Sequence, residues 1–203
     1  MRRPLILVTG FGPFPKVANN PSADLAQALA RSRRIRRAAR VRALIMRTAY
    51  TDTARLPRRV AREKPDAVLM FGLAGRARVL RIETRGRNQA SPGHPDASGK
   101  KARRVLVPGA PKLLKVTAPA ARLVKAARAA GAPARLSDDA GGYVCNAAIF
   151  HLLNATRGKN APLVAFVHIP WPREYAPGGK RRPAFSALQR AAEAILVTLA
   201  KQA

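Results

Sequence analysis

The chain has 203 residues, of which 47% are hydrophobic and 5% aromatic, and its 39 basic and 10 acidic side chains give a net charge of +29. This composition indicates a globular protein rather than a disordered one, and no apolar run approaches the ~20 residues that span a bilayer. A single cysteine excludes an internal disulfide framework and is typical of a reducing compartment, so we expect a cytoplasmic protein.

Strand and helix patterns alternate along the chain. Leu5–Val8 is a continuous apolar run, as in a strand that is buried on both faces. In chain order the patterns predict a strand at 5–8, a helix from 21, a strand at 41–46, a helix at 51–63 that Pro57 could divide, strands at 67–71 and 79–84, a helix at 118–130, a short strand at 135–136, a helix at 145–154, a strand at 163–169 and a helix at 185–201.

This alternation predicts one α/β domain over residues 1–203, a three-layer α/β/α sandwich with a mostly parallel central sheet. Residues 88–99 show no periodicity, and we expect them to form a mobile surface loop. In open α/β sheets, ligands bind outside the carboxyl ends of the strands. Three such ends are distinctive: the loop from Gly10 to Phe14, the segment Gly72–Gly75, and His168.

The only cysteine, Cys145, follows Gly141 and Gly142 at the predicted start of a helix. A thiol at that place feels the positive end of the helix dipole, which favours the thiolate and lowers its pKa. The free N–H groups of a first helical turn can also stabilise an oxyanion. These features indicate a catalytic nucleophile, and the alternative is an inert core cysteine.

Cysteine catalysis needs a base and a group that orients that base. His94 lies in the loop without periodicity, and His151 is six residues after Cys145, rotated around the same helix, so His168 at the rigid end of a strand is the favoured base. Glu83 is a conspicuous carboxylate in an arginine-rich segment. It is either the orienting group or an ion-pair partner of a neighbouring arginine, and the sequence does not separate the two.

Four segments together resemble the pyroglutamyl peptidase I family. VTGFGPFPKVANNPS at 8–22 is similar to its amino-terminal signature, and the stretch 72–83 is similar to its Gly-x-Ala-Gly segment and the glutamate that follows. SDDAGGYVCNAAIF at 137–150 resembles its nucleophile segment, and VHIPW at 167–171 resembles its histidine-containing strand end. The four occur in the family's order and cover most of the chain.

The resemblance implies a cysteine peptidase that removes an amino-terminal pyroglutamyl residue from peptides, with Cys145 as nucleophile, His168 as base and Glu83 as orienting group. It further implies that Phe11 and Phe14 hold the lactam ring. An apolar pocket suits that ring, because a pyroglutamyl group carries no charged amine.

The resemblance also implies that Asn20 lies near the site, where it orients its loop. Leu73 is a candidate substrate contact that stands where many members have glutamine, so a polar contact is lost there. After Glu83 the family continues as an apolar strand, whereas this chain has the charged segment 84–88. These departures leave substrate preference and subunit packing open more than the catalytic residues.

We therefore expect an acyl-enzyme on Cys145 and neither metal nor cofactor, since three scattered histidines and one cysteine show no ligand spacing. The expected partners are a peptide with an amino-terminal pyroglutamate and, by resemblance, further copies of the chain, with no membrane. One alternative is a related cysteine amidase with a different blocked substrate.

A second alternative is a basic nucleic-acid-binding protein on an inactive peptidase scaffold. A charge of +29 attracts polyanions without sequence preference. However, arginine outnumbers lysine 29 to 10, as in a biased coding composition, and few aromatic residues are available to stack on bases. We expect non-specific polyanion binding at most, with the charge mainly a property of the surface.

Overall fold

The computed structural model describes residues 2–176 and 182–203, and it contains one six-stranded sheet and one two-stranded sheet within them. The strands are β1 (Leu5–Phe11), β2 (Arg40–Met46), β3 (Ala67–Leu73), β4 (Leu80–Glu83), β5 (Arg85–Arg87), β6 (Leu113–Lys115), β7 (Ala134–Ser137) and β8 (Leu163–Ile169). The helices are α1 (Pro21–Arg31), the 3₁₀ turn η1 (Ile35–Arg37), α2 (Tyr50–Glu63), α3 (Ala120–Ala129), α4 (Val144–Ala155) and α5 (Phe185–Ala200).

The large sheet has the strand order β2-β1-β3-β8-β4-β7. The first four strands are parallel to one another, whereas β4 pairs antiparallel with β8 and parallel with β7. The carboxyl end of β8 therefore runs beside the amino-terminal end of β4. This seam between β8 and β4 brings residues about 85 positions apart in sequence into direct register.

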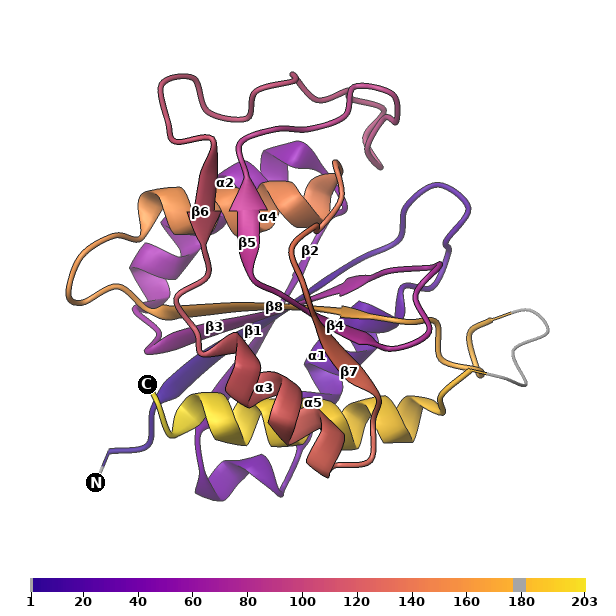
Figure 1. Cartoon of the computed structure of the whole chain (residues 1–203), viewed down its shortest axis with the longest axis vertical. Coiled ribbons are helices and arrows are strands. Elements are labelled where there is room, and N and C mark those ends of the chain that lie inside the picture. Colours follow the sequence, from indigo (N-terminus) through magenta and orange to yellow (C-terminus); the bar gives the residue numbers. More distant parts are fainter. Residues whose placement is uncertain (1, 177–181) are drawn as a thin grey trace.

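Helices cover both faces of the sheet (Figure 1). Helices α2 and α4 lie on one face, and α1, α3 and α5 lie on the other. Alternate residues of each central strand supply the two cores; in β8, for example, Val167 packs toward α5 and Phe166 toward α4. The predicted three-layer α/β/α sandwich with a mostly parallel sheet is confirmed.

Most predicted elements are present within a few residues of their expected bounds. The strand at 163–169 has the predicted limits, and α2 runs without a break through Pro57. The sequence missed the turn η1 and the strands β5 and β6, which pair antiparallel and pack on α4. Three-residue strands with the sequences Arg-Gly-Arg and Leu-Leu-Lys carry no strand periodicity that could have revealed them.

The loop expected at 88–99 has no regular secondary structure, but polar contacts anchor it. Asp96 is buried and accepts hydrogen bonds from the backbone N–H groups of Tyr50, Ser98 and Lys100 at 2.8–3.0 Å. Despite burial, a hydrogen bond from the Ser98 hydroxyl at 2.7 Å and these backbone bonds hold the pKa of the Asp96 carboxyl below its usual range. The carboxylate therefore ties the loop to the start of α2. Among the described residues, no helix has both the length and the apolar character needed to cross a membrane.

Candidate active site

The nucleophile candidate lies where the sequence predicts, in the first turn of α4. Cys145 is the second residue of that helix, directly after the N-cap residue Tyr143 and Val144. No side chain caps the helix at Tyr143, so the N–H groups of the first turn remain available to a ligand. Gly141, in the loop that leads into the helix, has a φ of +79°, a conformation that favours glycine.

The two other catalytic candidates meet across the seam. In the antiparallel register, Arg81 is opposite His168, and Glu83 is opposite Phe166, so all four side chains leave the same face of the sheet. Glu83 Oε1 lies 2.8 Å from His168 Nδ1. Both groups are removed from solvent, with residue exposures of 0% for Glu83 and 5% for His168.

Glu83 contacts both partners that the two interpretations from sequence require, the histidine and an arginine. Its Oε1 also lies 3.4 Å from the Arg81 guanidinium, while Arg85 pairs instead with Asp138 at 2.8 Å. The guanidinium of Arg81 further donates to Ser137 Oγ at 2.7 Å and to the carbonyl oxygen of Asp139. Arg81 therefore joins the buried carboxylate to the loop that leads into α4, a connection that sequence reasoning missed.

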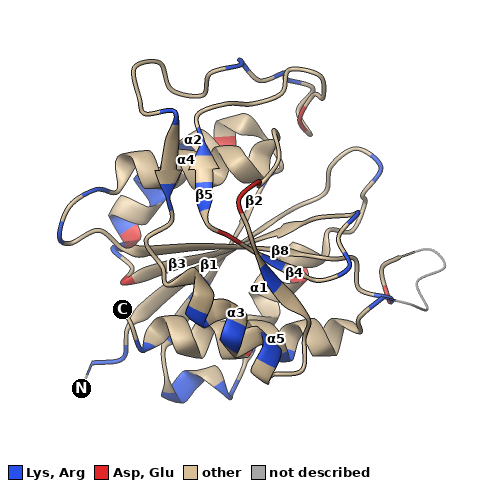
Figure 2. Cartoon of the chain, viewed as in Figure 1, with Lys and Arg blue, Asp and Glu red and all other residues tan. Residues whose placement is uncertain are grey.

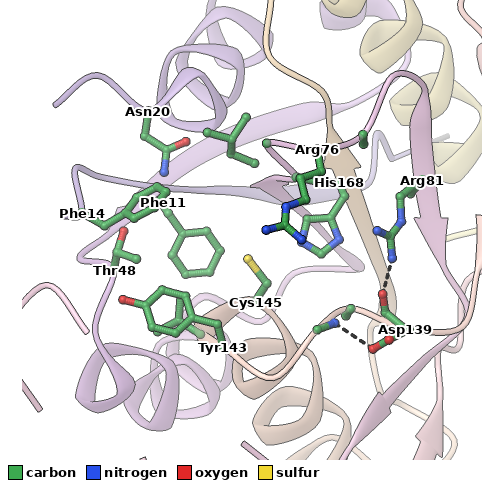
Figure 3. A pocket seen from close by; sticks show the side chains of 17 residues that line it. Phe11, Phe14, Asn20, Thr48, Arg76, Arg81, Asp139, Tyr143, Cys145 and His168 are labelled. Atoms are coloured by element: carbon green, nitrogen blue, oxygen red, sulfur yellow. Dashed lines mark hydrogen bonds between the residues drawn. The ribbon is translucent and has the colours of Figure 1, made fainter. Parts of the chain in front are cut away.

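The sulfur of Cys145 lies against Gly72 of β3. A Cβ atom placed on Gly72 would be 2.8 Å from the sulfur and 2.8 Å from Phe166 Cζ, so only glycine fits. Gly72 is the register partner of His168 in β8. The thiol therefore lies over the pair of strands that carries the imidazole, and Figure 3 shows both side chains at one cavity.

The other two histidines lie elsewhere. His94 is exposed in its loop, and His151 is half-buried on α4 with a pKa that burial lowers. Neither lines the cavity of Cys145, so the elimination made from sequence agrees with their placement. Because Glu83 engages Nδ1 of His168, the other ring nitrogen, Nε2, is free for proton transfer.

The ionisation of the thiol differs from the expectation. Removal from water, together with the negative charge of Glu83, raises the pKa of Cys145 to about 12. The favourable end of the helix dipole was expected to lower it, and burial outweighs that effect. The direction of the shift is therefore opposite to the one expected from the helix start, and it favours the neutral thiol. Its proton must leave during attack.

The cavity beside the sulfur has a volume of about 350 Å³. The four residues that the resemblance placed near the substrate, Phe11, Phe14, Asn20 and Leu73, all line it. Asn20 caps α1 by accepting from Ser22 N at 3.2 Å, and it donates to the Gly12 carbonyl at 3.0 Å. The amide thus holds the loop that carries Phe14.

Several lining residues were not predicted from sequence. They are Thr48, Arg76, Ala77, Arg81, Asp139, Ala140, Gly141, Tyr143 and Val144, whereas Ala74 and Gly75 belong to the strand end that the sequence singled out. Tyr143, two residues before the cysteine, packs edge-on against Tyr50 with the ring centroids 5.8 Å apart. Its hydroxyl donates to the Pro95 carbonyl at 3.0 Å, which links the cavity wall to the loop at 88–99. Proximity to Cys145 was the one signal that could have singled Tyr143 out.

Within residues 2–176 and 182–203, no cluster of three or more histidine, cysteine or carboxylate side chains is arranged to hold a metal ion. The basic side chains lie on helices of both layers and in the loops between them rather than on one face (Figure 2). This distribution agrees with the interpretation of the charge as a general surface property.

Comparisons with known proteins agree with the geometry. The family model described as pyroglutamyl peptidase matches residues 5–202. The pyrrolidone-carboxylate peptidase of Thermococcus kodakarensis is 35% identical over 173 residues, which are 84% of this chain and 83% of that protein. The corresponding peptidase of Gloeobacter violaceus is 36% identical over 174 residues, with coverage of 84% and 83%.

Solved structures show the same relationship. The crystal structure of pyrrolidone carboxyl peptidase from Thermus thermophilus superposes with a TM-score of 0.82 at 31% identity, covering 94% of this chain and 98% of that one. The structure of Bacillus amyloliquefaciens pyroglutamyl peptidase I gives a TM-score of 0.86 at 25% identity and covers 98% of each chain.

Proposed function

The chain belongs to the pyroglutamyl peptidase family, and from this premise we propose that it removes the amino-terminal pyroglutamyl residue of peptides through an acyl-enzyme on Cys145. It is a cysteine-type peptidase that acts at the peptide amino terminus. One observation carries the assignment of roles: a thiol over Gly72, beside a histidine whose Nδ1 is held at 2.8 Å by a buried glutamate.

The first half-reaction forms the acyl-enzyme. His168 Nε2 accepts the thiol proton as the sulfur attacks the pyroglutamyl carbonyl carbon, because a thiol with a raised pKa is not ionised beforehand. The Glu83 carboxylate fixes the ring orientation and stabilises the imidazolium that forms. N–H groups of the first turn of α4 donate to the oxyanion of the tetrahedral intermediate.

The remaining steps reuse the same groups. The imidazolium gives its proton to the nitrogen of the departing peptide as the C–N bond breaks, which leaves a thioester on Cys145. His168 then takes a proton from water, the resulting hydroxide attacks the thioester carbon, and the proton passes to the sulfur as it leaves. Free pyroglutamate and the neutral thiol are regenerated, and no metal or cofactor takes part.

The apolar part of the cavity suits the lactam ring. Phe11 and Phe14 supply flat apolar surface for a ring without charge, and Leu73 adds an aliphatic contact at the end of β3. Leu73 in place of glutamine removes one polar contact to the substrate. We therefore expect a higher KM than that of family members that have the glutamine. The comparisons do not favour the two alternatives, an amidase for another blocked substrate and a nucleic-acid-binding protein.

A rate assay with a chromogenic pyroglutamyl amide tests this function. We expect hydrolysis by the wild-type protein and none above background by Cys145→Ala, while the corresponding prolyl amide, which keeps the five-membered ring but carries a charged amine, is not cleaved. Equal hydrolysis by wild type and Cys145→Ala would contradict the mechanism. Cleavage of other blocked amides in preference to pyroglutamyl amides would favour the amidase.

Three wider proposals accompany this function. Residues 1–203 form one α/β peptidase domain, which is supported by a six-stranded sheet whose strands are drawn from Leu5 through Ile169. The protein is cytoplasmic, since its lone thiol must stay reduced to act. It forms a homo-oligomer, and because a charge of +29 opposes association, the subunits should assemble more strongly as salt concentration rises, as light scattering would measure.

A further inference from the structure

The two ends of the catalytic cavity differ in chemistry. Figure 3 shows Phe11, Phe14 and Tyr143 on one side of the Cys145 sulfur, with the arginine side chains beyond it on the His168 side. The neutral lactam ring belongs at the aromatic end. The departing nitrogen must lie within reach of His168, which protonates it. The peptide that follows the pyroglutamyl residue therefore leaves the cavity toward the arginines.

A second cavity of about 320 Å³ continues from that end. It shares Arg76, Ala77 and Arg81 with the catalytic cavity and adds Arg78, Val79 and Arg135. Four of these six lining residues are arginines, and none is acidic. We call this second cavity the arginine groove.

Three of the four guanidinium groups are available to a ligand. Arg76, Arg78 and Arg135 are exposed, and none of them forms an ion pair or a side-chain hydrogen bond within residues 2–176 and 182–203. Arg81 alone has a carboxylate partner, the buried Glu83. An anion that enters the groove would therefore meet cations that no acidic side chain of the described chain neutralises.

The arrangement carries a cost that a ligand would relieve. Arg81 in β4 and Arg135 in β7 are directly opposite each other in the parallel register. Like charges in such a pair repel and destabilise the sheet. A carboxylate between the two guanidinium groups would accept a charge-assisted hydrogen bond from each and so offset this repulsion.

The loop that carries Arg76 and Arg78 is fixed by its backbone. Arg182 donates to the Ala77 carbonyl at 2.6 Å and to the Gly75 carbonyl at 3.4 Å. The Ala74 N–H donates to the Ile169 carbonyl at 2.9 Å, which attaches the loop to the end of β8. The cations are thus presented from a held backbone, which lowers the entropy lost when they bind a ligand.

We propose that the arginine groove binds a side-chain carboxylate of the peptide that follows the pyroglutamyl residue, so that acidic pyroglutamyl peptides are the preferred substrates. This proposal rests on the proposed function, since the direction of the substrate follows from the role of His168. The carboxylate of an aspartate or glutamate and the terminal carboxylate of a short peptide share the required chemistry. The test separates these two sources.

Matched pairs of peptides, compared by their kcat/KM, provide the test. Pyroglutamyl tripeptide amides carry Asp or Asn at the first or the second position after the pyroglutamyl group, and pyroglutamyl-Ala-Ala is compared as the amide and as the free acid. We expect kcat/KM for the better Asp peptide to exceed that of its Asn counterpart by about fivefold, as a few partly exposed ion pairs would give. Arg78→Gln and Arg135→Gln should each lower this ratio, and the double variant should bring it near one.

Arg59→Gln is the matched control, because Arg59 is an exposed residue of α2 outside the groove and its loss removes the same charge. An equal fall of the Asp-to-Asn ratio in Arg59→Gln, or equal rates for Asp and Asn peptides in wild type, would overturn the proposal. A preference confined to the free acid, and lost in Arg78→Gln, overturns the side-chain assignment in favour of the terminal carboxylate. If no pyroglutamyl amide is hydrolysed at all, the proposed function itself fails, which is a different result from equal rates.

Discussion

The two halves of the large sheet differ in how they are built. In the parallel half, the inner strands β1, β3 and β8 have seven residues each and are buried almost throughout, and only the edge strand β2 is largely exposed or half-buried. In the other half, β4 and β7 have four residues each, and both carry an arginine. The proposed catalytic groups come from both: His168 from the parallel half and Glu83 from the short strands. The proposed chemistry thus depends on the antiparallel register of β8 and β4. There a long buried strand meets a short strand that buries much less apolar surface.

The largest effect should follow from breaking the pair across the seam. Glu83→Gln preserves the shape of the side chain but removes the charge that orients His168 and stabilises the imidazolium. We expect kcat on a pyroglutamyl amide to fall about ten-thousandfold, as with the corresponding neutral substitution in a Ser-His-Asp triad. Circular dichroism should show an unchanged fold.

Glu63→Gln on α2 is the control. Glu63 forms ion pairs with Arg62 and with Arg42 of β2, which is the edge strand farthest from β4 and β7. Its kcat should remain close to that of wild type. A loss of less than tenfold for Glu83→Gln would mean that Glu83 is only an ion-pair partner of Arg81, the second interpretation that the sequence left open.

A smaller effect should come from the parallel half. In Gly72→Ala the new methyl group would meet both the Cys145 sulfur and the Phe166 ring at 2.8 Å, so one of them must move. A displaced nucleophile should lower kcat about a hundredfold, since catalysis is sensitive to shifts of about 1 Å. Gly93→Ala is the matched control: its nearest neighbour would be 3.5 Å away, and its activity should be retained. Wild-type activity in Gly72→Ala would show that the sulfur need not lie against β3.

The comparison of the two halves also explains what sequence could and could not predict. Leu163–Ile169 was predicted with its observed limits because a strand buried on both faces has a nearly continuous apolar sequence. Strand β5 was missed because Arg-Gly-Arg has no such run; its place is decided by contact of Gly86 with Ile149 and Phe150 of α4. Local patterns encode burial well and do not encode which distant segment packs against a short strand.

The same limit applies to the site. Cys145, His168 and Glu83 could be chosen from sequence, but their meeting requires β4 to insert antiparallel beside β8, which no local pattern indicates. The ionisation of the thiol was predicted in the wrong direction. The helix start is visible in the sequence, whereas the burial of the sulfur and the nearby Glu83 charge depend on the tertiary structure.

A moderate effect should follow when Arg81 no longer connects Glu83 to the loop that leads into α4. Arg81→Gln removes the contacts with Glu83 and with the Asp139 carbonyl. Arg81 acts by positioning, so we expect a fall in kcat of about tenfold on a neutral pyroglutamyl amide with a smaller change in KM. Arg81→Lys, which keeps the charge but not the forked geometry, should recover only part of the loss. A change in KM alone would indicate a role in substrate binding instead.

The smallest effect concerns stability and arises from the thiol itself. The pKa of Cys145 is raised from 9.0 to about 12 in the folded chain, so between these values the unfolded chain binds fewer protons than the folded one. The free energy of unfolding must then decrease as pH rises from about 9 toward 12, by less than about 1.4 kcal/mol per pH unit. Below pH 9 both states hold the thiol proton, and the thiol gives no pH dependence.

Cys145→Ala has no such group, so the difference in stability between wild type and variant should be constant from pH 7 to 8.5 and should shift in favour of the variant at pH 10. Urea unfolding of both proteins at these pH values measures the difference directly. A difference that does not change between pH 8 and 10 would mean that the thiol has an ordinary pKa, and the attack on the substrate would then need less assistance from His168 than the burial of the sulfur implies.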